Sequence, residues 1–233
     1  MTKTLLAIGA HCDDCIVGIP GILLKALCKG YRVVILAMIG DYSNWPPSAP
    51  IKDWQKELIE GTKKICNEYG AEIRYLDFKS HLFNVNLDTI KSVAEAIADV
   101  QPDIAFLPWR QDYNDDHVVA SILGESALRY AGPLLDRQLV KGAPRLMFAY
   151  DNGPNHTISF EPDIFVDITK EWPAAMEWLG RFMALIRNKP YNPNFRDQAQ
   201  DIKEVLAAYR GITCGVRYAE AVQSLKKYPV EIP

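Results

Sequence analysis

Short apolar runs alternate with longer amphipathic stretches along most of this chain. The apolar runs have the length of buried strands and lie at residues 5–8, 31–38, 72–76, 103–107, 146–150 and 164–168. The amphipathic stretches have the apolar spacing of helices and lie at residues 20–29, 51–69, 87–100, 118–130, 172–188 and 196–210. This alternation predicts a three-layer α/β fold, in which helices cover both faces of a mostly parallel sheet. No repeat, low-complexity tract or linker divides the chain, so we expect one domain over residues 1–233.

Polar side chains gather where two of these predicted strands end. The first strand is followed by His11, Asp13 and Asp14, and the fourth strand is followed by the acidic segment 112–117, which ends in a histidine. Open α/β sheets place their active sites at the carboxyl ends of parallel strands, so the two clusters face each other if these strands are neighbours. Imidazole and carboxylate groups are ligands for zinc and other divalent cations. The pattern therefore predicts a metal site at this edge of the sheet.

One set of catalytic roles accounts for both clusters. A zinc hydrolase requires three protein ligands, an open position for water and a carboxylate that takes up and returns a proton. In this sequence His11, Asp14 and His117 would be the ligands, and Asp13 would be the base. Each histidine also has a simpler interpretation, because His11 could only cap a strand end and His117 could be a first-turn histidine of a helix. The two clusters taken together favour the metal site.

Composition and charge narrow the class of protein. The 233 residues are 48% hydrophobic, which is enough for a substantial core. The net charge of −3 argues against a protein that binds nucleic acid by neutralising phosphates, so a small-molecule substrate is the better expectation. The sequence shows neither a signal peptide nor an apolar run of membrane-spanning length, and we expect a soluble cytoplasmic protein.

Cysteine usage offers one competing hypothesis. The five cysteines are an odd and scattered set, which is typical of reduced thiols and not of a disulfide framework. Cys12 and Cys15 nevertheless form a C-x-x-C, which alone would indicate a thioredoxin-like redox pair or a soft metal site. A redox pair would leave His11 and Asp14 without a role, so we rank it below the metal hydrolase.

Two motifs resemble those of a known enzyme family. Segment 10–21 reads A-H-C-D-D-C-x-x-G-x-x-G, and segment 112–117 reads D-x-N-x-D-H. Together they resemble the LmbE-like family of zinc-dependent N-deacetylases, the relatives of N-acetylglucosaminyl-phosphatidylinositol de-N-acetylase. Segments 166–169 and 210–220 continue the resemblance toward the end of the chain.

The resemblance implies an activity and a role for each residue of the two motifs. It makes His11, Asp14 and His117 the ligands of Zn²⁺, or of another divalent cation such as Fe²⁺. It makes Asp13 the general base that activates a water on the metal, and it places Asp116 behind the ligands, where it would orient them. The implied reaction removes an N-acetyl group from an amino-sugar-like small molecule. The implied assembly is a homo-oligomer, either a trimer or a hexamer, of Rossmann-like subunits.

Three positions depart from the family pattern. Cys12 replaces a proline, Cys15 replaces a glutamate that lies behind the metal ligands, and Asn114 replaces a histidine that stabilises the oxyanion. Loss of one oxyanion donor typically costs ~10²–10³ in kcat, and we expect the Asn114 amide to donate the hydrogen bond instead. If these changes have removed catalysis, the protein is a binding module for a metal or a sugar.

Residues in the loops above the sheet are expected to contact the substrate. Trp45 and Tyr113 are aromatic residues that could stack on a sugar ring, and Asp112 lies in the same loop as Tyr113. His156 follows the strand predicted at 146–150, and it could be either a substrate contact or a surface histidine.

Overall fold

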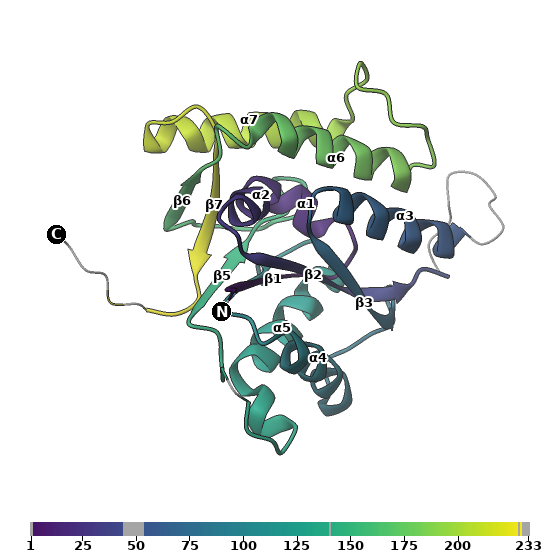
Figure 1. The fold of residues 1–233 in the computed structure, drawn as a ribbon, viewed down its shortest axis with the longest axis vertical. Helices are drawn as coiled ribbons and strands as arrows, with labels where there is room; N and C mark the ends of the chain where they lie inside the picture. Colours follow the sequence, from purple (N-terminus) through teal and green to yellow (C-terminus); the bar gives the residue numbers. More distant parts are fainter. Residues whose placement is uncertain (1, 44–53, 140, 228, 230–233) are drawn as a thin grey trace.

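One mixed sheet forms the centre of the molecule. The structure of the protein is a computed structural model, which describes residues 2–43, 54–139, 141–227 and 229. The strands of the described residues are β1 (Thr4–Gly9), β2 (Arg32–Asp41), β3 (Glu72–Lys79), β4 (Ile104–Pro108), β5 (Leu146–Tyr150), β6 (Ile164–Asp167) and β7 (Ala219–Ser224). They pair in the order β3-β2-β1-β4-β5-β7-β6 (Figure 1).

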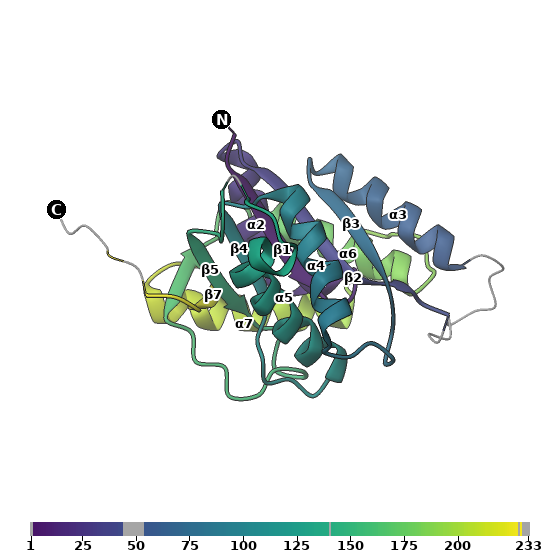
Figure 2. The ribbon, with the colours of Figure 1, turned by 90° about the horizontal axis from the view of Figure 1, so that it is seen from below.

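Helices cover both faces of this sheet. They are α1 (Asp14–Gly18), α2 (Pro20–Cys28), α3 (Trp54–Glu68), α4 (Leu87–Val100), α5 (Asp115–Leu134), α6 (Trp172–Ile186) and α7 (Gln198–Cys214). Figures 1 and 2 show α4 and α5 packed together on one face, while α1, α2 and α3 lie on the other. Helix α6 packs across α1, α2 and α3, and α7 lies against α6 and β7. The predicted three-layer α/β fold is thus confirmed.

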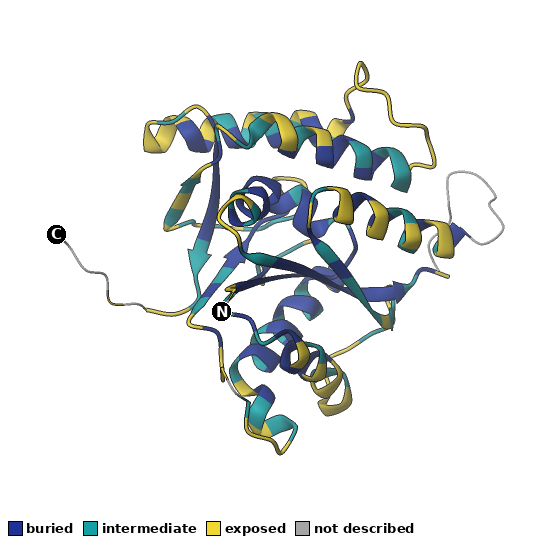
Figure 3. Ribbon diagram, in the orientation of Figure 1, coloured by how far each residue is buried: buried dark blue, intermediate teal, exposed yellow. Residues whose placement is uncertain are grey.

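The strands from β3 to β5 are parallel, and each is joined to the next along the chain through at least one helix. Parallel strands that are covered on both faces need apolar side chains in both directions. Every residue of β1 is accordingly buried, and Figure 3 draws β1 and most of β2 in the dark blue of buried residues. This double burial explains why the strands could be recognised as uninterrupted apolar runs.

The other edge of the sheet is antiparallel and was only partly predicted. Strand β7 lies between β5 and β6 and runs antiparallel to both. The apolar pattern predicted β6 but not β7, because the β7 sequence AEAVQS is short and carries Glu220 in its first half. Glu220 is 0% exposed, so its charge must be compensated inside the protein.

The strand order fixes where a site can form. The chain runs outward from β1 through β2 to β3 and then returns to the other side of β1 with β4. This reversal opens a crevice at the carboxyl ends of β1 and β4, where open α/β sheets bind their ligands. Both polar clusters of the sequence analysis follow these two strands. No helix in the described part of the chain combines the length and the apolar character needed to cross a membrane.

Candidate functional site

The loop after β1 is folded around the side chain of Asp14. Its Oδ2 accepts hydrogen bonds from the backbone N–H groups of Ala10, at 2.7 Å, and His11, at 3.0 Å. A Cβ on Gly9 would lie only 2.9 Å from the Cβ of Asp14, so this tight turn requires glycine. Asp14 is the first residue of α1 and Asp13 is its N-cap. Asp14 thus begins a short helix in a segment where no helix was predicted before residue 20.

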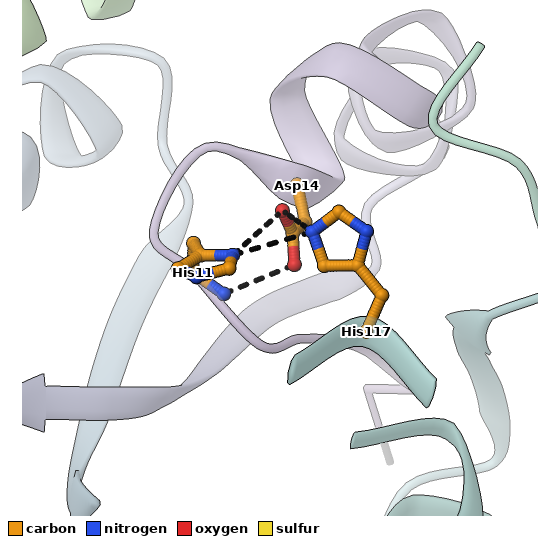
Figure 4. Close-up of side chains that lie close together, drawn as sticks. All are labelled: His11, Asp14 and His117. Atoms are coloured by element: carbon orange, nitrogen blue, oxygen red, sulfur yellow. Dashed lines mark hydrogen bonds and ion pairs between the residues drawn. The ribbon is translucent and has the colours of Figure 1, made fainter. Parts of the chain in front are cut away.

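His117 joins this loop from the first turn of α5. Figure 4 shows His11, Asp14 and His117 pointing toward one another. His117 Nε2 lies 3.2 Å from His11 Nδ1 and 3.2 Å from Asp14 Oδ1, and His11 Nδ1 lies 3.6 Å from Asp14 Oδ1. Two donor atoms bound at about 2.1 Å to one tetrahedral ion are about 3.4 Å apart. The three side chains, which the sequence places 106 positions apart at most, thus have the spacing of ligands to a common metal ion.

The outer nitrogen of each imidazole faces a carboxylate. His11 Nε2 lies 3.2 Å from Asp116 Oδ2, and His117 Nδ1 lies 3.0 Å from Asp112 Oδ2. A neutral imidazole carries its single proton on the nitrogen that donates, so the two inner nitrogens present lone pairs. Two lone pairs 3.2 Å apart repel each other unless a cation lies between them. The donor set therefore fits a metal ion.

Nearby carboxylates stabilise the protonated, positively charged form of both imidazoles. Burial alone would lower the pKa values of both imidazoles. Hydrogen bonds and ion pairs with carboxylates outweigh burial, and raise the pKa to about 9 for His11 and about 10 for His117. Burial would raise the pKa of Asp14, but the two imidazoles hold it well below its ordinary value. Without a metal both rings would therefore hold protons at neutral pH, and a bound cation would displace these protons and leave the rings neutral.

Asp116 is held in place by the end of β3, a contribution that the sequence analysis missed. The Ser80 hydroxyl donates to Asp116 Oδ2 at 2.9 Å, and the backbone N–H of His81 donates to Asp116 Oδ1 at 2.9 Å. Ser80 directly follows β3, so the rule that functional groups gather at strand ends could have identified it. The same Asp116 Oδ2 is the atom that contacts His11 Nε2.

Asp13 lies beside the three ligand residues and opens into a cavity of about 220 Å³. Burial and the neighbouring Asp14 carboxylate raise the pKa of Asp13 above its ordinary value. Polar residues from the later half of the chain complete the cavity, among them Asn152, Arg187 and Lys203. The apolar part of the lining comes from Met183, Ile202 and Leu206. A carboxylate with a raised pKa at the edge of a small cavity is suited to exchange protons with a ligand.

The other predicted residues of the 112–117 loop have distinct surroundings. The Asn114 Oδ1 caps α5 by accepting from the Asp116 N–H at 2.9 Å, which leaves its Nδ2 as the group that could donate to an oxyanion. Asp112 lies between two histidines, because its Oδ1 is 3.7 Å from Nδ1 of His156. Tyr113 is 74% exposed, and its backbone N–H donates to the carbonyl of His156.

Two further predicted residues are placed differently relative to the cavity. His156 lines the cavity. Cys15 is buried on the far side of the loop, where its thiol lies 3.5 Å from the Tyr150 hydroxyl. Trp45 lies outside the described residues.

The surroundings of the two cysteines do not support a redox pair. Cys12 and Cys15 are both buried as free thiols. Burial raises the pKa of each thiol, whereas a reactive thiol requires a lowered one.

Residues 151–206 supply cavity residues that carried no recognisable motif. Asn152 follows the end of β5 by two residues, so its place at a strand end was a usable signal. Arg187 follows α6, and Lys203 lies within α7, where the sequence analysis expected only an amphipathic helix. Nothing in their local sequence distinguishes these two from surface cations.

Comparison with known proteins places these motifs in a family. The model of the family described as PIG-L: GlcNAc-PI de-N-acetylase matches residues 6–128, which is more than half of the chain. Both sequence motifs lie within this range. The match confirms the resemblance that the motifs indicated.

Individual relatives extend the likeness to nearly the whole chain. Diacetylchitobiose deacetylase from Thermococcus kodakarensis is 26% identical over 238 residues, which cover 95% of this chain and 82% of that protein. The conserved protein TT1542 from Thermus thermophilus has a TM-score of 0.80 at 20% identity, over 100% of this chain and 98% of that one. GalB, the 4-carboxy-2-hydroxymuconate hydratase from Pseudomonas putida KT2440, has a TM-score of 0.78 at 20% identity, over 100% of both chains. Since one fold carries a deacetylase and a hydratase, the reaction must be argued from the site.

Proposed function

We propose, on the premise that this chain belongs to the PIG-L family, that it is a metal-dependent hydrolase that removes an N-acetyl group from an amino-sugar-like small molecule. The observation that carries the proposal is the convergence of His11, Asp14 and His117 within 3.2 to 3.6 Å, beside Asp13 at the edge of a cavity. The similarity to a protein named diacetylchitobiose deacetylase supports an acetylated sugar as the substrate.

The proposed cofactor is a divalent cation held by these three residues. Two imidazole nitrogens and one carboxylate oxygen suit Zn²⁺ in a hydrolase, and they also suit Fe²⁺. When bound, the metal would lower the pKa of a water and polarise the acetyl carbonyl. Asp112 and Asp116 would keep both imidazoles in the tautomer that presents a lone pair.

Asp13 is the proposed general base. Its carboxylate takes a proton from the attacking water and returns it to the amide nitrogen as the carbon–nitrogen bond breaks. Acetate and a free amine are the products, so one water is consumed and no other reactant is needed. The raised pKa of Asp13 supports this role, because a more basic carboxylate holds the proton between the two transfers. Asn114 Nδ2 and His156 are proposed to donate hydrogen bonds to the oxyanion and to the substrate, respectively.

The cavity supports a small substrate. Its volume of about 220 Å³ lies below the range of roughly 300–1,000 Å³ that is usual for drug-sized ligands. Its lining combines an apolar side with charged and amide groups, as an amino sugar would require.

The single domain, the homo-oligomer and the cytoplasmic location remain predictions, of which the oligomer can be tested by analytical ultracentrifugation.

An acetate-release assay tests the proposed function. The purified protein would be analysed for bound zinc and iron, and then incubated with N-acetylglucosamine and N,N'-diacetylchitobiose. We expect release of acetate and free amine, loss of both after chelation, and recovery after metal is added back. Metal binding without hydrolysis of any N-acetylated sugar would favour the binding module instead.

A further inference from the structure

Asn152 has a polar atom that the protein leaves unsatisfied. Its side chain lines the same cavity as Asp13, and the residue is only 7% exposed. Within the described residues, its buried Oδ1 has no hydrogen-bond partner. A buried amide oxygen without a partner is destabilising, so such an atom at a cavity wall indicates a ligand that supplies the donor.

The other end of the Asn152 amide is only weakly engaged. Nδ2 lies 3.4 Å from Nδ1 of His117, and that nitrogen lies 3.0 Å from the carboxylate of Asp112. The contact with Asp112 is the shorter of the two, so His117 Nδ1 pairs mainly with Asp112 and holds the amide of Asn152 only weakly. The backbone is fixed nevertheless, because the N–H of Asn152 donates to the Thr157 hydroxyl at 3.1 Å. The side chain of Asn152 is thus held beside His117, while its Oδ1 stays available to accept a hydrogen bond.

The neighbouring residue gives the same wall a second unsatisfied acceptor. Asp151 is also 7% exposed, and its Oδ2 accepts from Arg210 at 2.6 Å, while its buried Oδ1 has no hydrogen-bond partner among the described residues. Two adjacent acceptors on one wall favour a ligand that brings hydrogen-bond donors. An N-acetylated amino sugar has two kinds, the amide N–H and the hydroxyl groups.

We propose that Asn152 is a specificity-determining residue whose Oδ1 accepts a hydrogen bond from the amide N–H of the substrate. This inference rests on the proposed function and deepens it, because it makes the secondary amide, and not only the acetyl group, the feature that is recognised. An N–H held at Asn152 leaves the opposite side of the nitrogen free to receive a proton from Asp13, which lines the same cavity. An acetyl ester has no N–H and would leave the oxygen of Asn152 unpaired.

The test compares an amide with an ester of the same shape. The two ligands are N-acetylglucosamine and 2-O-acetylglucose, and the variants are Asn152→Leu and, as a matched control, Asn67→Leu on the exposed face of α3. We expect Asn152→Leu to lower kcat/KM for the amide about 10- to 100-fold and for the ester less than about 3-fold. Asn67→Leu should change neither. Equal losses on both ligands would overturn the inference, since a merely structural role near His117 would affect both.

A binding measurement keeps this inference separate from the proposed function. Calorimetry on metal-loaded Asp13→Asn protein would compare the affinities for the amide and for the ester. We expect the amide to bind more tightly, and the preference to vanish in the Asn152→Leu, Asp13→Asn double variant. If the unaltered protein hydrolyses no sugar but shows this preference, the inference stands and the deacetylase proposal fails. If the preference is absent or survives Asn152→Leu, the inference fails.

Discussion

The two histidines of the cluster present different ring nitrogens to its centre. His11 points Nδ1 inward and leaves Nε2 to Asp116, whereas His117 points Nε2 inward and leaves Nδ1 to Asp112. The choice of nitrogen is thus made by the position of each carboxylate and not by the histidine. Residues that never touch the ion would then control how tightly it binds.

Replacing these carboxylates should weaken metal binding without removing a ligand. We expect Asp112→Asn and Asp116→Asn each to lower metal affinity about 10- to 100-fold, because the imidazoles lose the partners that fix their tautomers. Competition with a chromogenic chelator measures this change. Asp115→Asn is the control, since Asp115 is exposed and lies between the two in the sequence. Unchanged affinity in Asp112→Asn and Asp116→Asn would contradict the positioning role.

Substitution of Asp13, the proposed base, should leave metal binding intact and lower turnover. Asp13→Asn should retain metal at full stoichiometry and lose about 10²- to 10⁴-fold in kcat, because the amide cannot take up a proton. Asp14→Ala should lose the metal itself. Elemental analysis and the acetate assay on the same samples separate the two effects. An Asp13→Asn protein with substantial turnover would remove Asp13 from its proposed role.

At the scale of single residues, the sequence identified groups that have a characteristic chemistry. His11, Asp14 and His117 could be found because few residue types bind metals and because these residues lie in the polar segments that follow β1 and β4. For Asn152 the preceding strand end was the one available signal, and it is a weak one, since an asparagine after a strand is most often a turn residue. Its importance depends on an unpaired oxygen, which only the packed structure reveals.

Among the elements, α7 begins at a cap that also contacts the preceding helix. Asp197 is its N-cap, accepts from the N–H of Ala199 at 2.9 Å, and forms a capping box with Gln200. The Arg187 guanidinium at the end of α6 also bonds both oxygens of Asp197, which ties the two helices together. Burial would raise the pKa of Asp197, but Arg187 and the Ala199 N–H hold it below its ordinary value.

Loss of this cap should destabilise the protein in a pH-dependent way. Asp197→Ala should lower the free energy of unfolding by about 1–2 kcal/mol at neutral pH. Because the pKa of Asp197 is lowered in the folded state, its contribution is complete above the unfolded pKa of about 3.9 and is lost as the pH falls through the folded value. Urea unfolding at about pH 7 and pH 3 should therefore show a smaller difference from the unaltered protein in acid.

A neighbouring aspartate provides the control for this measurement. Asp201 lies in the first turn of α7 and pairs with Arg196 at 2.9 Å, but its side chain is 62% exposed. Asp201→Ala should cost about 0.5 kcal/mol or less. Equal effects of Asp197→Ala and Asp201→Ala would show that general helix electrostatics, and not the cap, is responsible.

Elements were predictable where burial is two-sided or periodic. The helix at 87–100 and the strand at 146–150 have the predicted bounds, since their apolar patterns end at clear breaks. Helix α1 was missed because its five residues are too few to show a helical period. Strand β7 was missed because Glu220 contradicts the pattern of a buried strand, and its partners come from elsewhere in the chain.

At the scale of the whole molecule, one buried ion pair joins α7 and β7 to helices α1 and α2. Glu220 of β7 lies 2.8 Å from the Lys203 ammonium of α7 and accepts from the backbone N–H groups of Gly21 and Ile22 at the start of α2. Lys203 also donates to the carbonyl of Gly18 at 2.6 Å. Burial lowers the pKa of Lys203 despite the opposing effect of Glu220.

Breaking this pair on one side should be more damaging than removing both charges. We expect Glu220→Gln to lower the free energy of unfolding by about 3–5 kcal/mol, because the Lys203 charge is left buried without a partner. The double variant Glu220→Gln, Lys203→Met should recover a large part of this loss. Urea unfolding of the single and double variants measures both. A single variant that costs less than the double would contradict this account.

The proposed catalytic residues and most residues of the cavity lie in different parts of the chain. The family match ends at residue 128, and it contains the proposed ligands and the proposed base. Many of the cavity residues lie between Asp151 and Leu206, beyond the matched range. The proposed chemistry could therefore be predicted from the family motifs, whereas most of the proposed substrate cavity comes from a segment for which the sequence offered little guidance.

The position of β7 has a consequence for how the protein is made. The ribosome completes this strand after all the other strands, yet β7 must enter between β5 and β6. Until it arrives, the nascent polypeptide presents the open edge of β5 to any other chain that could pair with it. Glu220 would limit such mispairing, because a foreign strand could not provide the ammonium that this carboxylate requires.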